Sequence, residues 1–101
     1  MPNKVQEFNT YRQKMNDKLL SNDNKVIKRI FNLDTNAFKE GHLPVKTKEL
    51  LGLVASAVLR CDDCIQYHLE TAYTNGVSKE EMMETMSIAT LVGGTIVIPH
   101  L

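Results

Sequence analysis

The sequence predicts an all-α fold, a compact single domain of about five helices that spans residues 1–101. Two patterns indicate this fold: apolar residues recur with the 3.6-residue period of a helix, and no Val/Ile/Thr-rich run alternates as a strand does. The third observation is size. A chain of 101 residues that is 43% hydrophobic and 24% charged is typical of one globular domain.

Two helices are predicted in the N-terminal part. The first covers roughly residues 3–20 and presents an apolar stripe on one face. The polar run 21–24 ends it, because Ser, Asn and Asp favour turns and helix N-caps. The second helix covers roughly residues 24–40, and Gly41 is its predicted stop. The stripe of the first helix consists of Val5, Phe8, Tyr11, Met15 and Leu19.

A third helix is predicted to begin at Pro44, because proline suits the first helical turn, where its missing N–H costs nothing. This helix runs to about Arg60. Residues 50–59 are apolar nearly all round, so the helix is placed at the centre of the domain. Gly52 is expected to allow a close helix crossing, and it is assigned no chemistry.

The fourth helix is predicted to start near residues 61–64 and to stop at the Asn-Gly pair 75–76, which is typical of a helix C-terminus. Ser78 and Glu81 have the spacing of a capping box, so they indicate where the fifth helix begins. The fifth helix is rich in methionine and aliphatic residues, and a Gly-Gly pair interrupts or ends it.

The last seven residues, 95–101, are very apolar and are expected to pack on the body of the domain or on another subunit. About 100 residues bury a limited core, and two cysteines cannot be the main support of the fold. Association with further copies of the chain is a common alternative for small domains.

Twelve basic and twelve acidic residues balance, so no general electrostatic attraction favours nucleic acid or an anionic membrane as a partner. Residues 1–60 carry 11 Lys/Arg and 6 Asp/Glu, a net charge of +5, and residues 61–101 carry one Lys and 6 Asp/Glu, a net charge of −5. The two oppositely charged segments could attract each other, within one fold or between subunits. The alternative is that they form two solvated surfaces that happen to differ in charge. No apolar run reaches the roughly 18 residues of a membrane helix. Residues 1–7 have no apolar signal core, so the cytoplasm is the expected compartment.

The most informative segment for chemistry is Cys61-Asp62-Asp63-Cys64, followed one turn later by His68. Cysteines at positions i and i+3 share one helix face with Cβ atoms about 5–6 Å apart, near the range in which a disulfide closes. The start of a helix favours a thiolate, and His68 on the same face can take the thiol proton. Asp62 and Asp63 are expected to cap the helix, although their negative charge opposes thiolate formation.

Glu49 is a second candidate for the site. If the third and fourth helices form an antiparallel hairpin, Glu49 lies roughly 16 Å before the turn and His68 roughly 10 Å after it. The two side chains could then meet directly or through one water, and the carboxylate would fix the tautomer of the imidazole. The alternative is a surface glutamate between Lys46 and Lys48.

Three other uses of the cysteine pair stay open. Each cysteine could be a small buried core residue, or the pair could bind zinc with His68. Structural zinc usually takes four ligands, and the chain has no second cysteine pair. An inert disulfide is the third use, which the cytoplasm disfavours. His42 and His100 are isolated in the sequence and are interpreted as surface or turn histidines.

The pattern of Glu49, Cys61, Cys64 and His68 at these spacings resembles the signature of the alkylhydroperoxidase D-like (AhpD-like) proteins of the carboxymuconolactone decarboxylase superfamily. Three flanking segments resemble the family as well: residues 43–50, 59–61 and 76–81. The match spans roughly residues 43–94. The resemblance implies an all-helical AhpD-like fold that assembles as a homotrimer or homohexamer.

The resemblance also implies peroxidase or disulfide reductase activity that depends on thiols, with no metal, flavin or haem. It makes Cys64 the attacking thiol, Cys61 the resolving thiol, and Glu49 and His68 the proton relay. A hydroperoxide or a disulfide would be the substrate. An external dithiol, in some members a lipoylated protein, would be the reductant. Lactone decarboxylases of the superfamily lack the cysteine pair, and the best-known peroxidase holds two related halves where this chain holds one. A non-catalytic assembly or a redox-sensing stress protein is the alternative function.

Overall fold

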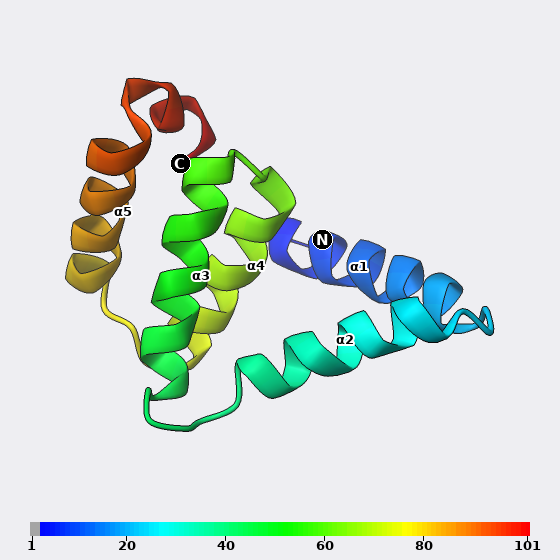
Figure 1. Cartoon of the computed structure of the whole chain (residues 1–101). Helices are drawn as coiled ribbons and strands as arrows, with labels where there is room; N and C mark the ends of the chain where they lie inside the picture. The colour runs from blue at the N-terminus through cyan, green and yellow to red at the C-terminus, as the bar shows by residue number, and fades with distance from the viewer. Residues whose placement is uncertain (1–2) are drawn as a thin grey trace. The chain divides into compact units, whose positions relative to one another are not determined.

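The computed structural model describes residues 3–101, and its regular elements in that range are all helices, with no strand (Figure 1). The elements are α1 (Lys4–Leu20), α2 (Lys25–Ala37), α3 (Val45–Leu59), α4 (Asp62–Thr74), α5 (Lys79–Gly93) and the short 3-10 helix η1 (Thr95–His100). The prediction of an all-α fold with five helices is confirmed, and the cysteine pair lies at the start of the fourth helix.

Contacts divide the chain into two compact units, residues 1–37 and 38–101. In the first unit, α1 begins with a capping box between Asn3 and Gln6. The carboxamide oxygen of Asn24 accepts hydrogen bonds from two amides in the first turn of α2. Helix α2 ends at Ala37, so the predicted end at residue 40 is wrong. The chain bends there, and Gly41 lies within the bend rather than directly after the helix.

The second unit contains α3, α4 and α5. Helix α3 packs against both of the others (Figure 1), which confirms its predicted central position. The buried core is formed by small and aliphatic residues from all three helices and from η1: Leu53, Ala57, Ile65, Ala89 and Val97. Contact with two neighbours accounts for the apolar residues of segment 50–59 that face α4 and α5. Leu51 and Leu59 of the same segment are exposed.

The end of α3 determines where the cysteine pair lies. Arg60 adopts the left-handed conformation, with φ 59° and ψ 39°. Its amide donates to the carbonyl of Ala57, and the amide of Cys61 donates to the carbonyl of Ser56, both at 3.0 Å. This is the Schellman arrangement, which satisfies the last carbonyls of a helix. The tight turn places Cys61 directly at the start of α4.

The apolar tail turns back through Gly93 and Gly94. Gly94 has φ 85°, a conformation that favours glycine. A Cβ atom on Gly93 would stand 2.6 Å from a methyl carbon of Val97, so only glycine leaves space for this valine. Val97 is fully buried and anchors η1 against α5 and α3. The expectation that the tail packs on the body is therefore met by this residue.

The N-terminus of α5 contains the predicted capping box of Ser78 and Glu81. The carboxylate of Glu81 also lies 2.9 Å from the ammonium of Lys46 on α3. The hydrogen bond from Lys46 and the bond from the Ser78 amide lower the pKa of Glu81 from 4.5 to about 2. These bonds stabilise the fold above pH 4.5, and the stabilisation is lost as the pH falls toward 2.

We expect Glu81→Gln to lower the unfolding temperature at pH 6, because glutamine keeps the capping box but loses the ion pair with Lys46. The difference from the parent should shrink between pH 4.5 and pH 2, where the parent carboxylate is protonated. Thermal unfolding followed by circular dichroism at several pH values measures it. Glu84→Gln, at an exposed position of the same helix, is the control. A difference that stays constant across this pH range would contradict the assignment.

Candidate active site

Cys61 and Cys64 form a disulfide at the first turn of α4, with Cα atoms 5.2 Å apart. Cys61 is also the N-cap of the helix, and its Sγ accepts a hydrogen bond of 3.3 Å from the amide of Cys64. Cys64 is exposed and Cys61 is half-buried. Neither thiol belongs to the hydrocarbon core, so the interpretation as two buried core cysteines is wrong.

The predicted capping role of the two aspartates is also wrong. Because Cys61 occupies the N-cap position, Asp62 and Asp63 fall in the first turn of the helix itself. A carboxylate in the first turn still interacts favourably with the positive end of the helix dipole. Asp62, however, makes its hydrogen bond to a histidine from a distant segment and not to a helix amide.

Glu49 and His68 lie in direct contact across the antiparallel pair of helices α3 and α4. Nδ1 of His68 is 2.8 Å from Oε2 of Glu49. Glu49 is only 2% exposed, and the His68 side chain is 13% exposed. The interpretation of Glu49 as a surface residue is therefore wrong. A buried carboxylate needs a hydrogen-bonding partner, and here His68 provides it, which fixes the orientation of the imidazole.

Three further residues, which sequence reasoning did not assign to the site, surround the imidazole of His68. Phe38 stacks on the ring with centroids 5.1 Å apart, and Tyr67 contacts its edge at 5.2 Å. A Cβ atom on Gly52 would stand 2.7 to 2.9 Å from three atoms of the ring. The glycine was expected to allow a helix crossing without chemical consequence; the structure shows that it makes space for the imidazole.

We expect Gly52→Ala to displace His68 and to break its hydrogen bond to Glu49. Overpacking of this kind costs about 1–3 kcal/mol, and the higher helix propensity of alanine offsets about 1 kcal/mol of it. The result is a net loss of about 1 kcal/mol of stability. Chemical denaturation measures this loss, and the nitrogen chemical shifts of the imidazole report the broken hydrogen bond.

Gly41→Ala is the matched control for this change. A Cβ atom on Gly41 would meet its nearest neighbour, the Lys48 ammonium, at an ordinary 3.6 Å. It should leave the imidazole shifts unchanged. Unaltered shifts in Gly52→Ala would show that the ring accommodates the methyl group without moving.

His100 was interpreted as an isolated surface or turn histidine; it is partly exposed, but it is not isolated. Its Nδ1 lies 2.8 Å from Oδ1 of Asp62, so the end of η1 binds the first turn of α4 next to Cys61. The two residues are 38 positions apart, and no local pattern in the sequence connects them. His42, by contrast, is exposed in the bend before α3.

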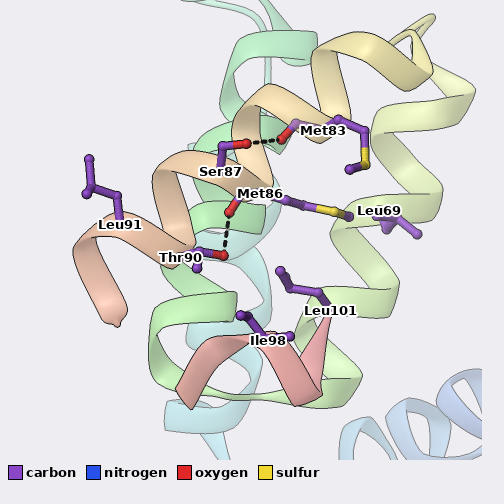
Figure 2. Close-up of a pocket in the computed structure, with 8 residues that line it drawn as sticks. All are labelled: Leu69, Met83, Met86, Ser87, Thr90, Leu91, Ile98 and Leu101. Atoms are coloured by element: carbon purple, nitrogen blue, oxygen red, sulfur yellow. Dashed lines mark hydrogen bonds between the residues drawn. The ribbon is translucent and has the colours of Figure 1, made fainter. Parts of the chain in front are cut away.

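An open apolar groove of about 800 Å³ lies away from these residues, between α4, α5 and η1 (Figure 2). Its lining consists of Leu69, Met83, Met86, Ser87, Thr90, Leu91, Ile98 and Leu101. Both hydroxyl groups in this set donate to carbonyls of α5 itself, at 2.9 Å. The groove thus offers mainly carbon and sulfur to a ligand, and none of the predicted site residues lines it.

Within residues 3–101, no group of three His, Cys, Asp or Glu side chains is arranged to hold a metal ion. The same residues include no helix that is long and apolar enough to cross a membrane. The site that the structure assembles is therefore a disulfide flanked by two histidine–carboxylate pairs.

The sequence was compared with models of known protein families. The model of the carboxymuconolactone decarboxylase family matches residues 24–101. The chain belongs to this family. The AhpD-like resemblance predicted from four residues and their flanks is confirmed at this level, and the match extends through α2 to the end of η1.

Solved structures and curated proteins are similar to this chain. A crystal structure of a family protein from Thermotoga maritima, for which a role in the antioxidative response has been suggested, is 53% identical. It covers 93% of this chain and 80% of its own, with a TM-score of 0.89. A second crystal structure from Thermotoga maritima is 54% identical, with a TM-score of 0.91 and coverage of 93% and 82%.

Two curated relatives are uncharacterized proteins. One, from Cupriavidus necator, is 31% identical over 57% of this chain and 51% of its own length. The other, encoded in the cox locus of Paracoccus denitrificans, is 33% identical over 52% of this chain and 47% of its own. The chain thus spans about half the length of the curated relatives that it matches.

Proposed function

We propose that this protein is a thiol-dependent oxidoreductase that reduces an alkyl hydroperoxide or a disulfide, with Cys61 and Cys64 as its redox pair. One observation carries the proposal. A buried carboxylate, Glu49, holds an imidazole, His68, on the helix that presents the exposed Cys64 four residues earlier. Side chains four residues apart leave the same face of a helix. The arrangement supplies a nucleophile, a base and a group that orients the base.

In the first step, the imidazole of His68 takes the proton of the Cys64 thiol, and Glu49 stabilises the imidazolium that forms. The thiolate attacks one oxygen of the hydroperoxide and the O–O bond breaks. The sulfur becomes a sulfenic acid, and the alkoxide leaves with the proton that His68 held. Cys64 is the attacking residue in this proposal because it is the more exposed of the two cysteines.

In the second step, the Cys61 thiol attacks the sulfenic sulfur. The S–O bond breaks, water leaves, and the disulfide seen in the structure forms. An external dithiol returns two electrons and two protons to the pair by thiol–disulfide exchange and becomes a disulfide itself. With a disulfide as substrate, a mixed disulfide with Cys64 replaces the sulfenic acid. A lipoylated protein is a dithiol donor of the required kind.

The proposal includes assembly as a homotrimer or homohexamer. Its support is the number of large apolar side chains that stay exposed at the end of α5 and in η1: Leu91, Val92, Ile96 and Ile98, each more than half exposed. Several large apolar side chains exposed within one short segment are typical of an interface. Analytical ultracentrifugation of the full chain measures the subunit number, and a monomer at micromolar concentration would contradict the assembly.

Mass spectrometry of the reduced protein tests the reaction. One sample receives one equivalent of an alkyl hydroperoxide, another one equivalent of glutathione disulfide, and iodoacetamide stops each reaction at set times. The oxidant that closes the Cys61–Cys64 bond faster identifies the reaction class. Closure no faster than the oxidation of free dithiothreitol would overturn the proposal. Stoichiometric closure without turnover, when a dithiol is supplied in excess, would instead favour a redox sensor.

A further inference from the structure

A second histidine–carboxylate pair, formed by His100 and Asp62, lies next to the disulfide in the chain. The Asp62 carboxylate, which accepts from His100, belongs to the residue that directly follows Cys61, so the two Cα atoms are about 3.8 Å apart. The imidazole is 28% exposed and the carboxylate 71% exposed. This pair is thus far more accessible than Glu49 and His68, and the reaction described above does not use it.

The position of His100 is determined by the fold and not by chance contact of a loose tail. Val97 is fully buried three residues earlier, and Gly93 leaves the space that its methyl groups occupy. The 3-10 helix from residue 95 to 100 then carries the imidazole to the start of α4. The contact therefore joins two segments that the core already holds in place.

Few charged side chains lie near the redox pair, where α3 ends and α4 begins. Helix α3 carries no charged side chain over residues 50–59, and α5 carries none over 85–93. Among its side chains the tail adds only His100. The ionisable side chains close to the pair are therefore Arg60, Asp62 and Asp63, together with the Glu49–His68 pair across α3 and α4. A carboxylate beside a thiol opposes its ionisation. In a site with so few charges, the Asp62 carboxylate has a measurable effect.

We propose that His100 is a positioning residue for the redox pair, which binds the Asp62 carboxylate and offsets its charge beside the thiols. Protonated imidazole cancels the charge of the carboxylate, and neutral imidazole still donates a hydrogen bond that holds it in place. His100 thereby keeps the reduced pair reactive near neutral pH. The inference rests on the proposed function, because it assigns a role at the same thiols.

The test measures the rate at which iodoacetamide alkylates Cys64 in the reduced full chain between pH 5.5 and pH 9. In this reaction the thiolate displaces iodide. Digestion on the amino side of aspartate separates Cys61 from Cys64, so mass spectrometry reads each thiol by itself. His100→Gln should slow alkylation of Cys64 about threefold at pH 6.5, since an upward shift of half a unit in the thiol pKa is a factor of about three. The effect should shrink toward pH 9, where a thiol ionises without help from its neighbours.

His42→Gln is the matched control. It removes the same kind of side chain from the opposite end of α3, which is 15 residues long and so separates it from the cysteines by about 22 Å. That separation exceeds the screening length in physiological salt. His42→Gln should alkylate as the parent does. The circular dichroism spectra and unfolding temperatures of both variants show that they are folded.

A double-mutant cycle with Asp62→Asn decides whether His100 acts through the carboxylate. Asp62→Asn alone should accelerate alkylation, and adding His100→Gln to it should then have little effect. An unchanged rate in His100→Gln, or a loss of the same size in the Asp62→Asn background, would overturn the inference. The alkylation measurement does not depend on turnover. It can therefore contradict the role of His100 while the protein is still an active oxidoreductase. Conversely, an inactive protein with the expected shift would overturn only the proposed function.

Discussion

The Cys64→Ser variant is expected to lose hydroperoxide turnover completely. Serine has nearly the shape of cysteine, but its hydroxyl is a far weaker nucleophile than a thiolate at neutral pH. It also leaves Cys61 without a partner for the disulfide. The decrease in hydroperoxide concentration in the presence of excess dithiol measures the loss. A variant that still turns over would overturn the assignment of Cys64 as the attacking thiol.

Cys61→Ser is the matched control for this experiment. It also removes the disulfide, so both variants lose the same cross-link, which closes a short loop and contributes about 2 kcal/mol by the chain-entropy model. With no dithiol present, Cys61→Ser should nevertheless consume one equivalent of hydroperoxide per chain and stop with a sulfenic acid on Cys64, which dimedone traps. Comparing the two variants therefore distinguishes the cysteine that attacks the hydroperoxide from the cysteine that resolves the sulfenic acid.

The second large effect is expected from Glu49→Gln. Glutamine fills the same volume and can still accept a hydrogen bond from His68, but it carries no charge to stabilise the imidazolium. A positioned general base typically contributes about 10²–10⁴-fold to a reaction, and loss of the carboxylate that supports His68 removes part of this contribution. We therefore expect kcat/KM for the hydroperoxide to fall by about two orders of magnitude and alkylation of Cys64 to slow in parallel.

Glu40→Gln, at an exposed position in the bend before α3, is the control for the change in net charge and should behave as the parent. The circular dichroism spectrum and unfolding temperature of Glu49→Gln show whether the variant is folded, because removing one partner of a buried pair is destabilising when the other stays charged. Normal activity in a folded Glu49→Gln variant would show that His68 works without its carboxylate.

Much of the fold could be predicted because its signals are local. The capping box of Ser78 and Glu81 fixes the start of α5 within four residues of sequence, and the structure contains it. The cysteines and His68 share a face because helical periodicity places them there. The sequence left two alternatives for Glu49, a contact with His68 and a place on the surface. The contact could not be preferred from the sequence, because it requires α3 and α4 to be antiparallel.

The residues that sequence reasoning missed act over distances that no local pattern encodes. Gly52 is recognisable as a special residue, but only the position of α4 shows that its missing side chain makes space for His68. Phe38 was included in the second helix; the structure ends that helix at Ala37, and its ring instead stacks on the imidazole. His100 reaches Asp62 only because Val97 anchors the tail.

The hydrogen bond from the amide of Cys64 to the sulfur of Cys61 allows the oxidation state of the pair to be followed by NMR. The atom that ends the backbone hydrogen-bonding network of α4 is the same atom that gains and loses electrons. Reduction turns this disulfide sulfur of Cys61 into a thiol, which accepts the hydrogen bond with a different strength, so the proton resonance of this one amide should move each time the pair is reduced. A single peak in an ordinary two-dimensional NMR spectrum would then report the oxidation state of the protein in real time, without any added label.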